Sequence, residues 1–144
     1  MTASLTVESM LGHRPRASKA PLTPLQWVSV IRQGIPAAAV DSLVQLLGIS
    51  QSELAAALAI PDRTLARRKK EGKLNSEETA KLVRLARVIG RAGEVFEDMD
   101  AARHWLKSPN AALAGAAPLS LLDTDIGAES VLDTLGRIEH GVFA

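Results

Sequence analysis

The sequence predicts an all-α protein. Apolar residues recur at spacings of three and four, and Gly or Pro separates these runs, which is typical of successive amphipathic helices. Only 3% of the 144 residues are aromatic, and no segment shows the strict alternation of a half-buried strand. The length is that of a single domain, or of one domain with an appendage, and a hydrophobic content of 47% is enough for a buried core.

Two helices are expected before residue 50. The first follows a Thr23 cap and ends at Gly34, and the second runs from Pro36 to Gly48. The buried stripe of the first helix is expected to hold Leu25 and Val28, with Ile31 or Trp27.

The next segment predicts a helix-turn-helix. Ser50 and Glu53 form a capping box that begins a short helix, and a second helix starts near Asp62 and ends before Gly72. The small side chain of Ala55 fits the point where the two helices of such a motif cross closely.

The second helix of this motif is strongly basic. Six Lys or Arg and two Asp or Glu lie between residues 61 and 73, a net charge of +4. In a helix-turn-helix, this helix enters the major groove of DNA. The alternative is a solvated basic face without a nucleic-acid partner. The expected DNA contacts are Arg63, Thr64, Arg67, Arg68, Lys69 and Lys70.

The sequence after the helix-turn-helix also predicts helices. A long helix is capped by Asn75 or Ser76, and another starts at Asp98 or Asp100. A helical turn follows Pro118, and a last helix covers roughly 125–140. The small residues of 110–117 are expected to form a flexible segment.

Charge divides the chain into two parts. Residues 1–93 carry 14 Lys or Arg and seven Asp or Glu, whereas residues 94–144 carry three and nine, so the net charges are +7 and −6. Opposite charges suggest two surfaces with different partners. We expect a flexible arm over 1–20, a helix-turn-helix domain over 21–93 and a small helical C-terminal module over 94–144.

Several function classes lack support in the sequence. There is no Cys, the three His are far apart, and no glycine-rich phosphate loop is present. We therefore expect no catalytic residue, no metal and no cofactor. No apolar run reaches the length of a membrane span, and the N-terminus does not resemble a signal peptide, so the expectation is a soluble, cytoplasmic protein without a membrane partner.

From about Gly34 to Ala144 the chain resembles the Xre/MbcA/ParS antitoxins of type II toxin–antitoxin systems, whereas the first 20 residues fall outside the family pattern. The resemblance is carried by Leu47–Ser50, Glu53–Ala55, Arg63–Lys69, Leu74–Asn75, Glu77–Glu78, Leu82–Arg87, Glu94–Phe96, Ala101–Leu106, Pro109–Leu113, Pro118–Leu119, Leu122–Thr124 and Arg137–Phe143.

This resemblance implies a DNA-binding part that represses its own operon and a C-terminal module that binds a RES-domain toxin. Such toxins consume NAD, by degrading it or as ADP-ribosyltransferases, and the antitoxin blocks the NAD cleft. It also implies self-association, as a dimer within the toxin–antitoxin complex. The alternative is a stand-alone regulator whose C-terminal module only dimerises. The implied toxin contacts are Arg137, Glu139, His140, Gly141, Val142, Phe143 and Ala144.

Overall fold

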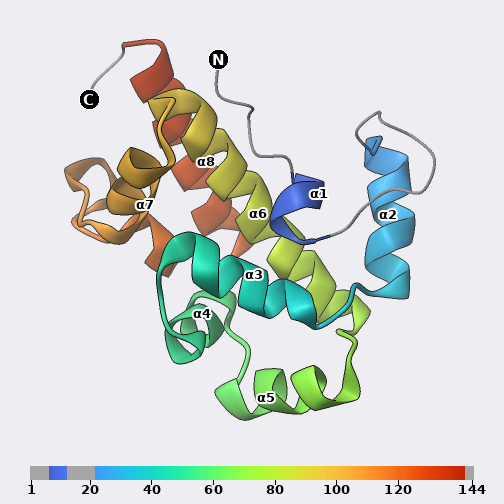
Figure 1. Ribbon diagram of the computed structural model, residues 1–144. Coiled ribbons are helices and arrows are strands. Elements are labelled where there is room, and N and C mark those ends of the chain that lie inside the picture. The colour runs from blue at the N-terminus through green and yellow to red at the C-terminus, as the bar shows by residue number, and fades with distance from the viewer. Residues whose placement is uncertain (1–6, 13–21, 142–144) are drawn as a thin grey trace.

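Figure 1 shows the computed structural model of the chain, in which residues 7–12 and 22–141 are described. Within these ranges every regular element is a helix, and the only strand-like pairing is one bridge between Pro36 and Lys73, which confirms the all-α prediction. The α-helices are α1 (Val7–Met10), α2 (Pro24–Gln33), α3 (Ala38–Leu47), α4 (Gln51–Leu58), α5 (Asp62–Glu71), α6 (Ser76–Phe96), α7 (Met99–Lys107) and α8 (Asp125–Glu139). Two 3-10 helices, η1 (Ala111–Leu113) and η2 (Pro118–Leu121), lie between α7 and α8.

The long helix α6 is the centre of the fold. Its Leu82, Leu85 and Ile89 are almost completely buried. Helices α1 to α4, from the N-terminal part of the chain, all contact α6. The most extensive contacts of α6 are with α7 and α8. Figure 1 shows α6 running diagonally through the molecule, with α5 at one end and the last turn of α8 at the other. The helix-turn-helix and the C-terminal module therefore share one helix.

The loop before α3 is fixed against the loop that follows α5. Gly34 has φ +84°, and a Cβ there would lie 2.2 Å from the carbonyl oxygen of Leu74, so only Gly fits without strain. The amide of Leu74 donates to the carbonyl of Ile35 (3.0 Å), and the buried Ile35 amide donates to the Thr79 hydroxyl (3.2 Å). These bonds join the loop before α3 to the loop that follows α5 and to the first turn of α6.

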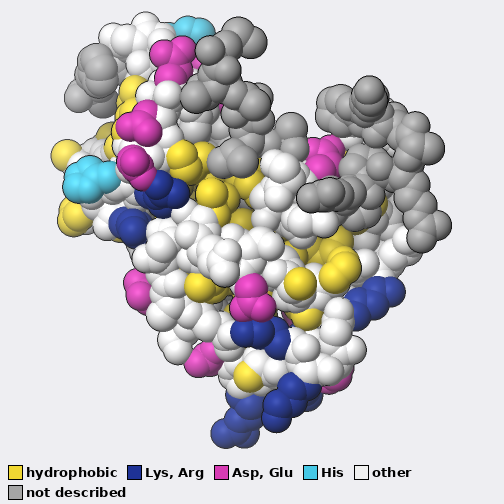
Figure 2. All heavy atoms as spheres, in the orientation of Figure 1, with side chains coloured by type: hydrophobic (Ala, Val, Ile, Leu, Met, Phe, Trp, Pro, Cys, Tyr) yellow, Lys and Arg dark blue, Asp and Glu magenta, His cyan; other side chains and the backbone are white. Residues whose placement is uncertain are grey.

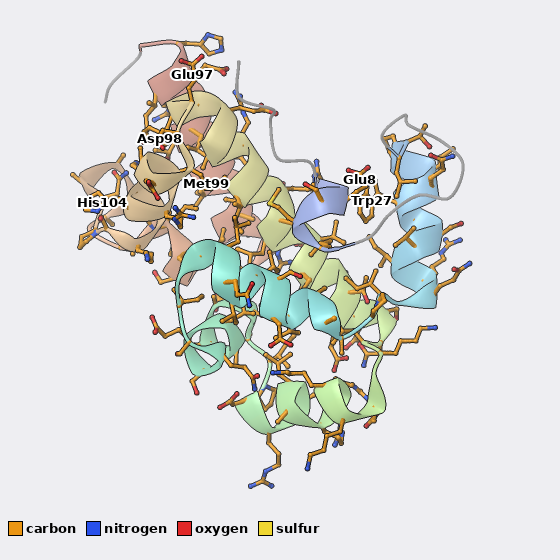
Figure 3. All side chains as sticks on the ribbon, viewed as in Figure 1. Glu8, Trp27, Glu97, Asp98, Met99 and His104 are labelled. Atoms are coloured by element: carbon orange, nitrogen blue, oxygen red, sulfur yellow. The ribbon has the colours of Figure 1, made fainter. Side chains whose placement is uncertain are left out.

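Part of the expected N-terminal arm is ordered. Residues 7–12 form α1 and its following turn, which pack on α3 and α6 and bury Met10 and Leu11. Glu8 accepts a hydrogen bond from the Leu22 amide (2.8 Å), and Figure 3 places Glu8 and Trp27 in the space between α1 and α2. The expectation of a flexible arm is wrong for these residues, because two buried side chains fix them to the core. The remaining residues of 1–20 lie outside the described ranges.

The predicted buried stripe of α2 is also wrong in part. Leu25 and Val28 are 81% and 39% exposed. Helix α2 instead turns Trp27, Val30 and Ile31 toward the core, where they are half-buried. Leu25 and Val28 are therefore wrong as stripe residues, whereas Trp27 and Ile31, the two predicted alternatives, both lie on the covered side of α2, which packs mainly along α6.

The segment 110–117 is a folded loop, contrary to the expected flexibility. The Asn110 amide donates to Ala116 O (3.1 Å), and the Gly115 amide donates to Asn110 O (2.9 Å). Leu113 of η1 is buried beneath this loop. Small residues here allow a tight turn.

Candidate functional site

The pair α4 and α5 has the geometry of a helix-turn-helix. The Ser50 hydroxyl accepts from the Glu53 amide (3.1 Å) and the Glu53 carboxylate accepts from the Ser50 amide (3.2 Å), so the predicted capping box is confirmed. Ala59 adopts a left-handed conformation after α4, and the Ile60 amide donates to Ala55 O (3.0 Å). The buried Ala55 lies on the inner side of this tight turn.

Three basic side chains of α5 point away from the protein, and together they form what we call the basic face: Arg63, Arg67 and Lys70. They are spaced by four and three residues, and all are exposed, whereas Leu65 is the buried residue of this helix. Arg67 makes an exposed ion pair with Glu71 (3.3 Å). Among the described residues, Arg63 and Lys70 make no ion pair. Figure 2 shows Lys and Arg gathered at the end of the molecule formed by α5.

Arg68 is turned toward the protein. Its Nε donates to both oxygens of the buried Glu78 carboxylate (2.9 and 3.1 Å), and its Nη1 donates to Glu71 (3.1 Å). The same Glu78 carboxylate accepts the Asn75 amide (2.9 Å) in the capping box of α6. The hydrogen bond to Glu78 is the main reason that the pKa of Arg68 is raised. Arg68 thus joins α5 to the start of α6.

Lys69 is held by a polar network across three helices. Its Nζ contacts Asp41 of α3 (2.8 Å) and donates to Gln51 of α4 (3.0 Å). Asp62, at the start of α5, accepts from the side-chain Nε2 of Gln51 (3.0 Å) and from the Ser52 hydroxyl (2.8 Å), and these bonds lower the pKa of Asp62.

The predicted DNA-contact residues therefore fall into three groups. Those on the basic face point to solvent, Thr64 is half-buried beside it, and Arg68 and Lys69 are engaged by protein partners. A signal for the last group was present in the sequence: they follow Leu65 by three and four residues, which places them on its side of the helix.

The end of α8 forms the second candidate surface. Arg137, His140 and Gly141 are exposed there. Glu139 is bound by Arg91 of α6 through two hydrogen bonds, of 2.6 and 2.9 Å, which are the main cause of a raised pKa for Arg91 and a lowered pKa for Glu139. Val142, Phe143 and Ala144, the other predicted residues of this surface, lie outside the described ranges.

Two contacts that the sequence does not predict join α7 to α3. Arg103 and Lys107, one turn apart on α7, donate to the carbonyls of Leu46 and Leu47 (both 3.0 Å). These carbonyls belong to the last turn of α3, where a helix attracts positive charge. Nothing in the local pattern around residue 105 predicts this contact, because it depends on where the chain returns.

The described residues contain no cluster of three or more His, Asp or Glu able to hold a metal ion. Among the helices in these same ranges, none has both the length and the hydropathy to cross a bilayer.

Two family descriptions match the chain, one for each candidate surface. Residues 26–87 match the antitoxin Xre-like helix-turn-helix domain. Residues 91–141 match the C-terminal toxin-binding domain of the Xre/MbcA/ParS antitoxins. The boundary between the two matches falls inside α6.

Individual proteins agree with these matches. The chain is 36% identical to "Antitoxin Xre" of Yersinia enterocolitica over 119 residues, which cover 81% of this chain and 80% of that protein. It is 28% identical to the "Prs ADP-ribosylating antitoxin" of a Sphingobium species, over 85% of this chain and 83% of that protein. A chain in the crystal structure of the Mycobacterium tuberculosis MbcT–MbcA toxin–antitoxin complex is similar in fold, with a TM-score of 0.56, 26% identity, and coverage of 75% of this chain and 96% of that one.

Proposed function

Since this chain belongs to the Xre/MbcA/ParS antitoxin family, we propose that it neutralises a NAD-consuming RES-domain toxin by blocking the toxin's NAD cleft with its C-terminal segment. The observation that carries the proposal is the match of residues 91–141 to a toxin-binding domain. The relative named for ADP-ribosylation and the MbcT–MbcA complex support a toxin partner of this kind, because ADP-ribosylation draws on NAD.

The chemistry of the C-terminal module suits such a cleft. Residues 94–144 carry a net charge of −6, and a cleft that binds an anionic dinucleotide presents basic groups. Phe143 would supply an aromatic ring in place of a stacked base, and the exposed Arg137, His140 and Gly141 would line the approach. The segment that we propose as the plug comprises Arg137, Glu139, His140, Gly141, Val142, Phe143 and Ala144, and within it the Glu139 carboxylate is held by Arg91 of the same chain.

The test is co-expression with the protein encoded beside this chain, followed by measurement of NAD consumption by the complex and by the toxin alone. The proposal expects co-purification and NAD loss only for the free toxin. A Phe143→Ala variant should inhibit more weakly, and Arg63→Met, on the opposite end of the molecule, serves as the matched control with normal inhibition. Co-purification with full NAD consumption by the complex would rule out cleft blocking.

We further propose that the chain represses its own operon by placing α5 in the major groove. The basic face supplies contacts to phosphates and base edges, and Arg68 and Lys69 hold the helix in place. Such a repressor acts in the cytoplasm, and two copies would read two half-sites, so we expect a dimer within the toxin–antitoxin complex.

Fluorescence anisotropy with a labelled duplex from upstream of the chain's own reading frame tests DNA binding, and light scattering gives the number of copies. DNA binding without any co-purifying toxin would favour the alternative function, a stand-alone regulator that uses its C-terminal module only to dimerise. Absence of binding to that duplex at low salt would contradict the repressor proposal.

A further inference from the structure

Helices α6 and α8 are tied together by an ion pair at each end of α8. At its start, Arg84 of α6 contacts Asp125 (2.6 Å) and also donates to Leu122 O (3.0 Å). At its end, Arg91 of α6 binds Glu139. The two arginines are seven residues apart on α6, so they lie on the same side of that helix.

The pair at the end of α8 has the stronger geometry. Arg91 Nη1 and Nη2 each donate to one oxygen of Glu139, which is the bidentate arrangement that fixes both distance and orientation. The Arg91 side chain is 30% exposed and that of Glu139 is 39% exposed, so both are partly shielded from water. Arg91 also contacts Glu94 within α6 (3.3 Å), a contact that does not involve α8.

This pair acts on the last described turn of the chain. The His140 amide donates to Gly136 O (3.1 Å), and the Gly141 amide donates to Ile138 O (3.1 Å). Gly141 has φ +71°, a left-handed conformation that turns the chain away from the helix axis. Among the described residues, Glu139 makes the only ion pair that joins this turn to α6.

We propose that Arg91 is a positioning residue for toxin inhibition: by clamping Glu139 it holds the last turn of α8 in the orientation from which the C-terminal segment enters the toxin. This inference rests on the proposed function. It assigns Glu139 a partner within its own chain, and it leaves the direct contacts of the plug to Arg137 and the residues after Glu139.

The direction in which Arg91→Gln changes toxin inhibition distinguishes a clamp on Glu139 from a direct contact between Glu139 and the toxin. If Glu139 bound a toxin arginine, Arg91→Gln would release the carboxylate and leave inhibition unchanged or make it stronger. If Arg91 acts as a clamp, Arg91→Gln should instead weaken inhibition. Without the clamp the last turn of α8 must become ordered when it binds the toxin, and this ordering lowers the affinity. We expect the half-inhibitory antitoxin concentration to rise about fivefold, as for loss of a well-formed, partly exposed charged pair.

The experiment titrates antitoxin variants into the toxin encoded beside the chain and follows NAD consumption. Glu94→Gln is the matched control, since it removes the other acidic partner of Arg91 and should inhibit as the wild type does. Asp125→Asn breaks the ion pair at the far end of α8 and should also inhibit normally. Exchanging the charges, Arg91→Glu with Glu139→Arg, should recover most of the lost inhibition, which a direct contact of either residue with the toxin would prevent.

Hydrogen exchange of the free antitoxin tests the clamp without any toxin. The His140 and Gly141 amides should exchange about fivefold faster in Arg91→Gln than in wild type or Glu94→Gln, because the clamp opposes local opening of this turn. Unchanged exchange in Arg91→Gln overturns the inference, and so does unchanged inhibition. Failure of the wild-type chain to inhibit NAD consumption would instead reject the proposed function itself.

Discussion

Two equivalent core substitutions should separate the two proposed activities, DNA binding and toxin inhibition. Leu65 of α5 and Leu135 of α8 are both completely buried, and Leu65 is the buried residue that holds α5 to the rest of the protein. We predict that Leu65→Ala abolishes DNA binding and spares toxin inhibition, whereas Leu135→Ala weakens inhibition and spares DNA binding. Both substitutions replace a buried leucine by alanine, so any difference between their effects comes from their positions in the fold.

The expected magnitude follows from the burial. Each substitution removes a fully buried leucine side chain and should lower the free energy of unfolding by about 3 kcal/mol. For a chain of this length that lowers the thermal midpoint by about 6–12 °C. Single domains usually have about 5–15 kcal/mol of stability, so both variants should remain folded well below their midpoints.

Three measurements check this prediction at one temperature below both midpoints. Circular dichroism gives the midpoint, anisotropy gives affinity for the upstream duplex, and NAD consumption gives toxin inhibition. Because α6 is shared, DNA binding and toxin inhibition separate only if each structural defect stays at its own end of that helix. If both variants lost both activities to the same extent while still folded, the separation of the two surfaces would be refuted.

The remaining predictions concern single sites. Arg63→Met should weaken DNA binding and reduce the slope of log affinity against log salt by about one unit, measured by anisotropy over a salt series. Gly127→Ala should lower the thermal midpoint strongly, because its Cβ would lie 1.8 Å from a backbone oxygen of η2, whereas Gly136→Ala, with open space, should raise stability by about 0.5–1 kcal/mol. By NMR titration the pKa of Glu139 should lie below its ordinary value of 4.5 and return toward it in Arg91→Gln. With a lowered pKa the clamp contributes fully above that ordinary value and is lost as the pH falls through the lowered one.

Local chemistry made most of the helices predictable. The capping box of Ser50 with Glu53 is a short-range pattern that reciprocal hydrogen bonds confirm, and of the two predicted caps for the long helix, Asn75 is the N-cap. Gly34, Gly48 and Gly72 end helices where the sequence predicts ends. The family resemblance stated from the sequence is confirmed by matches to both parts of the chain.

Tertiary contacts limited the prediction of the site. A run of basic residues indicates a surface, but it does not show that Arg68 finds Glu78 ten positions later or that Lys69 finds Asp41. The partner of Glu139 is 48 positions away on another helix, so no spacing rule could identify Arg91. The sequence shows which residues are charged, but it does not show which of them form ion pairs.

Two ion pairs on α6, Arg68 with Glu78 and Arg91 with Glu139, indicate how toxin binding would affect repression. Arg68 contacts the N-terminal turn of α6 and Glu139 contacts its C-terminal part, so the two proposed surfaces meet opposite ends of one helix. A rigid helix with a single arrangement does not transmit a change in affinity, because coupling requires two states that the ligands distinguish. A toxin that holds two antitoxin chains together would instead strengthen operator binding by raising the effective concentration of the second α5. Stronger repression by the complex should accordingly depend on having two half-sites in the operator, and a duplex with one half-site should bind antitoxin and complex equally well.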